Sequence, residues 1–267
     1  TASVRTPCGS SKPFDVRTGV RQGSVSGPFL FNLVVDDILR RVNDELPAEV
    51  IIIPSGRPLN DLCFADDIAV LAESAQYFQS VCTKIEEKAA AHGLSLRPEK
   101  CKVLCSGPSL SSGIQVSGHQ IETVSSFVYL GSTIHVDCKI DREIKVRAAK
   151  STSAFNSLGK CLWNTDVSTT IKLRVYLTAI SPIFTYAAAT WTTTSSATEK
   201  LYITERRFLR RILGIFYPIV VSNDELYRRA NDAYKNLTRG KTARFPRVGE
   251  DVDKLRHTSY GVPRAVA

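Results

Sequence analysis

Methionine is absent from the chain, and tryptophan occurs only twice among its 267 residues. Because a sequence without methionine lacks an initiator, we expect it to be part of a longer reading frame. Long apolar runs are missing as well: none reaches the length that a membrane span requires, and no signal peptide is visible. The sequence therefore predicts no membrane association.

Cysteine is present, but its pattern indicates no disulfide framework. The seven cysteines are an odd number without a repeating spacing, which favours free thiols in a reducing compartment. Cys101 and Cys105 lie close together, but no second closely spaced pair of Cys or His accompanies them. We interpret them as structural residues and not as zinc ligands.

Negative charge is the scarcer sign. The net charge is +9 and the isoelectric point is near 9.3. A basic balance of this size favours a polyanionic partner, although charge alone says nothing about the fold. The length allows one large domain or two small ones.

The most informative stretch is Leu62–Leu71, in which Asp66 and Asp67 stand between two short apolar runs. Each run is too short for a helix and suits a buried strand, which predicts a tight hairpin with the acids at its turn. Asp is common in turns, so an isolated Asp-Asp pair is ordinary turn chemistry. Here no Gly, Pro or Asn makes the turn. A bound cation would relieve the repulsion between the carboxylates, which favours a magnesium site.

A second stretch, Thr18–Leu33, is a glycine-rich loop in which Pro28 suits the first turn of a helix. The apolar spacing that follows predicts a helix to about Asn43. Backbone N–H groups at such a helix start are a place for phosphate, although a plain loop-to-helix junction explains the same residues. Inside this helix, we interpret Asp36 and Asp37 as a solvated face.

Phe64-Ala65-Asp66-Asp67 resembles the F/Y-A-D-D box of reverse transcriptases, in particular those of non-LTR (LINE-type) retrotransposons. Thr18–Leu33 resembles the G-V-R-Q-G-x-x-x-S-P-x-L-F-N box of the same polymerases. It departs from that box at Ser26, where an apolar residue is usual, and at Gly27, where Ser is usual. The resemblance implies that Asp66 and Asp67 are catalytic and bind Mg²⁺ or Mn²⁺. The residues that would line the pocket for template base and incoming nucleotide are Arg21, Gln22 and Gly23.

Two further boxes follow in family order. Gly93–Lys102 resembles G-L-x-x-N-x-x-K-T, with Arg97 in place of Asn and Cys101 in place of Thr. By the resemblance, Lys100 lies near the incoming triphosphate; a surface lysine in a turn is the plain alternative. Next comes the Y-L-G box, a hairpin that would hold the primer end, and its residues are Tyr129, Leu130 and Gly131. The ordered set of four boxes is much more specific than any one of them.

Helices are expected from Asp141 onward. One is predicted after Ser168, which can cap it; it runs through Ile171, Val175 and Ala179, and Pro182 should kink or break it. Another is predicted over Thr198–Leu213. This helix carries four arginines, which form either a solvated face or a surface for the nucleic-acid backbone: Arg206, Arg207, Arg210 and Arg211.

The predicted fold class is α+β. We expect a partial polymerase palm over residues 1–135, an antiparallel sheet with packed helices. A helical thumb-like region over 136–230 and a loosely ordered basic tail over 231–267 should follow.

The resemblance implies an RNA-directed DNA polymerase that adds deoxynucleotides to a DNA primer on an RNA template by two-metal nucleotidyl transfer. It would act inside the cell, in nucleus or cytoplasm, as a ribonucleoprotein. The family's first box, which supplies another metal-binding Asp, is not found upstream of Gln22, so we expect this chain not to be competent alone. The alternatives are a non-catalytic nucleic-acid-binding protein and the relic of a decayed retroelement. A small Mg²⁺-dependent hydrolase is disfavoured because no further acid or His cluster accompanies the pair.

Overall fold

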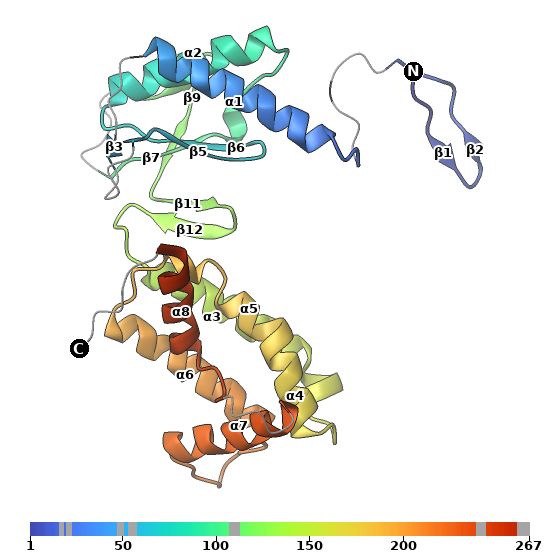
Figure 1. Cartoon of the computed structure of the whole chain (residues 1–267), viewed down its shortest axis with the longest axis vertical. Coiled ribbons are helices and arrows are strands. Elements are labelled where there is room, and N and C mark those ends of the chain that lie inside the picture. Colours follow the sequence, from blue (N-terminus) through green and yellow to red (C-terminus); the bar gives the residue numbers. More distant parts are fainter. Residues whose placement is uncertain are drawn as a thin grey trace. The chain divides into compact units, whose positions relative to one another are not determined.

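The computed structural model describes residues 1–15, 19, 23–46, 51–52, 58–106, 113–238 and 244–260 (Figure 1). The chain divides into two compact units, Thr1–Ser125 and Ser126–Ala267. The division falls ten residues before the predicted boundary, so the hairpin after Ser125 belongs with the helices. Among the described helices, none combines the length and the apolar character needed to cross a bilayer.

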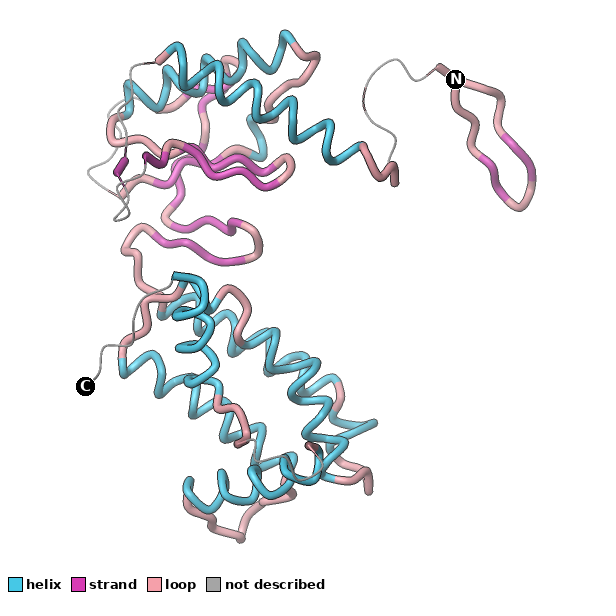
Figure 2. Tube along the Cα trace, in the orientation of Figure 1, coloured by secondary structure: helices cyan, strands magenta, loops and turns pink. Residues whose placement is uncertain are grey.

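The first unit combines short strand pairs with two helices, α1 (Gly27–Glu45) and α2 (Ala75–Ala91) (Figure 2). Four of its strand pairs are antiparallel: β1 (Arg5–Thr6) with β2 (Gly9–Ser10), β3 (Ile51–Ile52) with β4 (Pro58–Leu59), β5 (Asp61–Phe64) with β6 (Asp67–Val70), and β8 (Gln115–Val116) with β9 (His119–Gln120). The fifth pair is parallel and joins β7 (Lys102–Leu104) to β10 (Glu122–Val124). A short 3₁₀ turn, η1 (Pro98–Lys100), precedes β7.

Helix α1 confirms the predicted helix and runs two residues beyond Asn43, with Pro28 in its first turn. Helix α2 begins where the Ser74 hydroxyl accepts a hydrogen bond from the Tyr77 amide at 3.2 Å. The two helices pack side by side through one apolar cluster. Its buried members are Val35, Ile38, Leu39, Val42, Tyr77, Val81, Ile85 and Ala89.

The second unit opens with a hairpin, β11 (Ser126–Tyr129) and β12 (Ser132–His135), and continues as helices. These are α3 (Asp141–Ser157), the π-helical η2 (Gly159–Trp163), α4 (Thr169–Val175), the π-helical η3 (Tyr176–Ile180), α5 (Ser181–Phe184), the 3₁₀ turn η4 (Ala188–Thr190), α6 (Ser195–Ile212), α7 (Asn223–Leu237) and α8 (Val248–Tyr260). Aromatic rings fill the space between them: Phe155 stacks on Trp163 at 4.3 Å and on Phe208 at 4.5 Å between ring centroids.

The helix predicted through Ile171, Val175 and Ala179 exists, and Val175 packs against the core of the second unit. The buried residues are Leu173, Tyr176 and Ile180, whereas Ile171 is about half exposed. Apolar residues occur all round this segment, and its second half is π-helical, so a 3.6-residue period does not select the buried face. Ser168 stands before α4, but its side chain makes no capping hydrogen bond.

The loosely ordered tail predicted over 231–267 is also wrong for most of its described residues. Helix α7 continues to Leu237, and α8 follows from Val248. Three apolar side chains of this stretch are buried against α6 and its neighbours, namely Phe245, Val248 and Val252, each 1% exposed. This segment has few apolar residues, but it is ordered because three of them pack into cores formed by helices from other parts of the sequence.

A buried carboxylate joins three of these helices. Glu205 of α6 is 1% exposed and accepts hydrogen bonds from the Tyr227 hydroxyl of α7 and the Val248 amide at the start of α8, both at 2.9 Å. Burial raises the pKa of Glu205 to about 7, against the opposing effect of these two hydrogen bonds. Ionised Glu205 is thus costly to the fold, and protonation relieves that cost.

We predict that Glu205→Gln flattens the pH dependence of the stability of the second unit. A carboxyl group whose pKa is raised by folding stabilises the protein fully below its unfolded pKa. That contribution is lost as the pH rises through 7. For Glu205 the unfolding free energy should fall by roughly 3 kcal/mol between pH 4.5 and 8. Urea unfolding followed by tryptophan fluorescence measures it, since both tryptophans lie in this unit.

Glu225→Gln is the control with the opposite sign. Arg228 and Arg229 hold the pKa of this carboxylate down to about 2, so its contribution is lost only as the pH falls below its unfolded value. Glu225→Gln should therefore leave the slope of the unfolding free energy against pH unchanged between pH 5 and 8. A wild-type slope retained in Glu205→Gln would contradict the account of the buried carboxylate.

Candidate functional site

The acid pair lies at the tip of the β5–β6 hairpin, as predicted. Phe64 pairs with Asp67, which leaves Ala65 and Asp66 as the two turn residues. Ala65 has a φ of +53°, in the left-handed region that two-residue hairpin turns require and that Gly adopts more easily. Alanine therefore makes the turn for which the sequence offered no glycine, and it does so in a strained conformation.

Strand alternation sets the direction of each side chain in this hairpin. Ile68 and Val70 pack on the α1–α2 cluster, so Asp67 lies on the opposite face of the hairpin. That face also carries Leu62 and Phe64, which are 44% and 64% exposed. Asp66 and Asp67 are both exposed, and among the described residues neither carboxylate has a hydrogen-bond or ion-pair partner. Both are therefore available to a ligand.

The donor set fits part of a magnesium site. Carboxylate oxygens are the side-chain ligands that Mg²⁺ prefers, and the ion usually takes one or two of them with water and substrate phosphate. In the described ranges, no group of three or more His, Cys, Asp or Glu side chains could hold a metal ion. Asp66 and Asp67 could thus supply two ligands but not a closed protein cage.

A groove of about 670 Å³ runs between α1 and strand β5. Its acidic residues are Asp36, Asp44 and Asp61. Desolvation, followed by the charge of Asp61, raises the pKa of the Cys63 thiol in its wall to about 11. The thiol donates to Asp61 Oδ2 at 3.6 Å, so it stays protonated and is not a nucleophile at neutral pH.

Asp36 and Asp37 behave differently, although we interpreted both as a solvated face. Asp36 is exposed and lines the groove. Asp37 instead accepts hydrogen bonds from Arg40 at 3.0 Å and Arg41 at 2.8 Å. These contacts, led by the one from Arg40, lower the pKa of Asp37.

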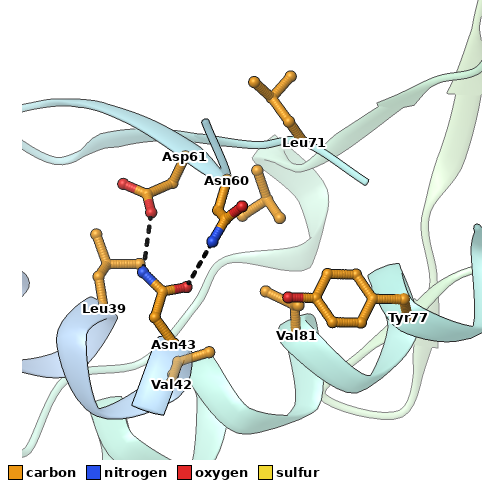
Figure 3. A pocket seen from close by; sticks show the side chains of 9 residues that line it. Leu39, Val42, Asn43, Asn60, Asp61, Leu71, Tyr77 and Val81 are labelled. Carbon is orange, nitrogen blue, oxygen red and sulfur yellow. Dashed lines mark hydrogen bonds between the residues drawn. The ribbon is translucent and has the colours of Figure 1, made fainter. Parts of the chain in front are cut away.

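Behind the hairpin, a small cavity of about 10 Å³ lies among side chains of α1, α2 and the two strands (Figure 3). The Asn43 amide donates to Asp61 at 3.5 Å, and Asn60 donates to Asn43 at 3.4 Å. Asn60 Oδ1 is buried without a partner among the described residues. A cavity of this size holds about one water, which would satisfy that oxygen.

The glycine-rich loop is only partly described. Arg21 and Gln22 lie outside the described residues, so their predicted position next to the acids stays a prediction. Gly23 has a φ of +83°, which favours glycine at this point of the loop. Lys100 ends η1 and is exposed, and no described hydrogen bond or ion pair joins it to Asp66 or Asp67.

The box Tyr129-Leu130-Gly131 forms the turn of the β11–β12 hairpin. Tyr129 pairs with Ser132, and the two turn residues, Leu130 and Gly131, have φ of +47° and +79°. Two successive positive values are typical of a type I′ turn. The sequence predicted a hairpin here, and the structure confirms it.

The four arginines of α6 do not share one solvated face. Arg206 is 14% exposed and pairs with Glu199 at 2.6 Å, while Arg210 donates to Asn223 at 3.0 Å. Arg211 donates to Asn156 and Asn164 and lies 5.9 Å from the centre of the Phe155 ring. Arg207 is exposed and has no partner among the described residues. Of these four arginines, only Arg207 could therefore take an external phosphate without breaking a contact that the described residues make.

Charge divides sharply between the two units. From Ser126 onward the sequence has 23 Lys and Arg against 12 Asp and Glu, a net charge of +11. Thr1–Ser125 has 12 against 14, a net charge of −2. The basic character of the chain is therefore a property of its helical unit.

Sequence reasoning also missed the buried ion pair of Glu143 and Arg147 on α3, whose side chains are 1% and 6% exposed. Both residues contact the β11–β12 hairpin. Their four-residue spacing in a region expected to be helical was the available signal, since opposite charges at this spacing lie on one helical face and can pair.

Comparison with known proteins gives consistent matches. Residues 4–134 match the family model of reverse transcriptase (RNA-dependent DNA polymerase). The chain is 31% identical over 167 residues, 60% of its length, to an uncharacterized transposon-derived protein of Caenorhabditis elegans, of which it covers 59%. It is 37% identical over 109 residues, 40% of its length, to a Pol polyprotein from retrotransposable element R2 of Nasonia vitripennis, of which it covers 10%.

A third match extends along almost the whole chain. Over 257 residues, 92% of this chain, it is 23% identical to the RNA-directed DNA polymerase from mobile element jockey of Drosophila melanogaster. It spans 25% of that protein, so the chain corresponds to a limited part of its polymerase relatives. Residues 4–134 therefore belong to the reverse transcriptase family, and the relatives of the chain include polymerases of non-LTR retrotransposons.

Proposed function

We propose that this chain is the part of an RNA-directed DNA polymerase that carries two of its metal-binding carboxylates, with a partial palm before Ser126 and a thumb-like region of helices after it. The observation that carries the proposal is the Asp66-Asp67 pair, exposed on a hairpin turn that is anchored on two helices. The substrates would be a DNA primer, an RNA template and deoxynucleoside triphosphates.

Asp66 and Asp67 would hold Mg²⁺ or Mn²⁺, with Asp66 as the more direct ligand because it lies in the turn itself. In two-metal nucleotidyl transfer, the bound ions lower the pKa of the primer hydroxyl and stabilise the charge of the transferring phosphate. The chain's own contribution is to fix two carboxylates beside the outer hairpin face. Leu62 and Phe64 on that face offer an apolar surface to the bases or sugars of the primer.

The remaining box residues would each contribute to substrate binding within their own unit. Arg21, Gln22 and Gly23 would lie against the template base and the incoming nucleotide. Lys100 would neutralise triphosphate charge. The turn of Tyr129, Leu130 and Gly131 would hold the primer end.

One carboxylate is missing from this set. In the reverse transcriptases that this chain resembles, a further Asp binds the metal ions, and the described residues offer no third acid beside the pair. We infer that another Asp comes from a segment upstream in the full-length protein, and that this chain alone is not a competent polymerase.

The proposed role of the acid pair in catalysis can be tested directly. The 267-residue chain should not extend a primer on RNA with Mg²⁺ or Mn²⁺. A longer protein that restores the upstream carboxylate should extend it, and Asp66→Ala should reduce that extension to background because a metal ligand is lost. The measurement is gel-resolved extension of a labelled primer.

Glu73→Ala is the matched control, since Glu73 is an exposed acid six residues beyond the pair. It should leave extension unchanged. Efficient extension by the 267-residue chain would refute the inference that a further carboxylate is required. Full activity of the longer Asp66→Ala protein would refute the role of the hairpin in metal binding.

Binding without catalysis is a second candidate function, and the division of charge favours it. A helical unit with a net charge of +11 can hold a nucleic-acid backbone whether or not the acid pair acts, because phosphate contacts need only positive charge. On this reading, the product of a decayed element would keep its affinity for nucleic acid and lack polymerase activity.

A substitution of Arg207 separates a binding surface from a solvated one. Arg207→Ala should weaken binding to a primer–template duplex of any sequence and lower the salt slope of log K by roughly one. Arg207 is preferable to Arg206 and Arg210, whose replacement would also break contacts within the chain. Arg207→Lys, which keeps the charge, is the control and should retain both affinity and slope. Equal affinities and slopes for the Ala variant and the wild type would assign Arg207 to a solvated surface.

A further inference from the structure

We propose that Glu143, Arg147 and Tyr186 form a brace that fixes the Leu130–Gly131 turn, and that they are positioning residues for the primer end. The second half of this inference rests on the proposed function of the hairpin. The first half concerns the fold of the second unit alone. None of these three residues belongs to the boxes that carry the family resemblance.

The turn needs external support. Leu130, with a φ of +47°, occupies a region that side chains with a Cβ adopt at a cost. Such conformations persist where the surroundings hold them, and they concentrate at functional sites. In other type I′ turns, Asn or Gly commonly takes this position.

Each residue of the turn is held by a separate contact. The Tyr186 hydroxyl donates to the Leu130 carbonyl oxygen at 2.6 Å. The Arg147 guanidinium donates to the Gly131 carbonyl oxygen. One residue pair further along β12, the Thr133 amide donates to Glu143 Oε2 at 2.8 Å.

The three side chains also hold one another. Arg147 Nε donates to Glu143 Oε1 at 2.5 Å, and the guanidinium carbon lies 4.3 Å from the centre of the Tyr186 ring. An added Cβ at Gly131 would meet the Tyr186 hydroxyl at 3.4 Å, so ring and turn are in close approach. The brace is therefore a connected unit and not three independent contacts.

The ion pair is buried beneath an exposed hairpin. Burial opposes ionisation of Glu143, but the hydrogen bonds from Thr133 and Arg147 outweigh it and lower its pKa. Above the pair, the hairpin exposes Phe127, Val128, Leu130 and Ile134, which are between 36% and 59% exposed. A buried ion pair contributes little net stability compared with apolar residues of similar size. Such a pair can instead specify one conformation of the groups that it contacts, which here is the conformation of the exposed Leu130–Gly131 turn.

Tyr186→Phe is the variant that tests the brace. It removes one hydroxyl and keeps the ring against Arg147, whereas removal of Glu143 or Arg147 would leave a buried charge unpaired and could unfold the unit. Tyr217→Phe is the matched control, since Tyr217 is 96% exposed. Both variants should keep the wild-type circular dichroism spectrum.

The first measurement is amide hydrogen exchange of the peptide that spans the hairpin, in the free chain. Loss of a hydroxyl-to-carbonyl hydrogen bond should speed exchange at Val128–Thr133 about five-fold. Tyr217→Phe should leave exchange there unchanged. Equal exchange in wild type and Tyr186→Phe would overturn the brace.

The second measurement is the ratio of affinities for a duplex with a recessed primer 3′ end and for the same duplex with blunt ends. A braced turn that positions the primer end should favour the recessed duplex. Tyr186→Phe should reduce that preference several-fold and leave the affinity for the blunt duplex unchanged. A general loss of structure would instead lower the affinity for the blunt duplex as well.

The two measurements fail separately. Faster exchange with an unchanged preference would leave the brace standing and overturn the positioning role. A wild-type chain without any preference for recessed ends would overturn the proposed primer-holding function of the hairpin, and exchange would still decide the brace. Faster exchange together with a reduced preference supports both.

Discussion

The candidate site depends on the packing of Ile68 and Val70 against the α1–α2 cluster. A two-stranded hairpin is marginal in water by itself, so the helices supply the stability that the acid-bearing turn lacks. Because side chains alternate along β6, burying these two residues turns Asp67 to the outer face and leaves Asp66 in the turn. A slip of one residue would reverse both faces. The apolar contact therefore positions the carboxylates without touching them.

The same construction occurs in each unit: a short hairpin with a strained turn is held on helices. Ala65 and Leu130 both have positive φ without being glycine. Apolar packing holds the first hairpin, whereas a buried ion pair and a tyrosine hold the second. The charges also differ, since the unit with the acid pair is slightly negative and the helical unit carries the positive charge. The acid pair and the excess of positive charge thus belong to separate units.

The sequence predicted features that depend on local signals. Two short apolar runs around Asp66 sufficed for the hairpin, and Pro28 with regular apolar spacing sufficed for α1. Features that depend on distant partners were missed. Leu173 is buried on a helix that has apolar residues on every side. The face that is buried therefore depends on which elements pack against this helix. Phe245 orders a stretch of low apolar content by entering a core built by α4, α6 and α7. The burial of Glu143 was missed because it depends on the β11–β12 hairpin, where the Thr133 amide donates to its carboxylate.

The central claim is that the hairpin turn is a divalent-cation site, and titration of the isotope-labelled chain with Mn²⁺ tests it directly. Paramagnetic broadening of backbone amide signals reports which residues lie near the ion. The account predicts that Phe64–Ile68 broaden first and that Asp66→Asn removes the effect. It would be contradicted by broadening centred instead on the groove acids Asp36, Asp44 and Asp61, or by the same broadening of the turn in Asp66→Asn.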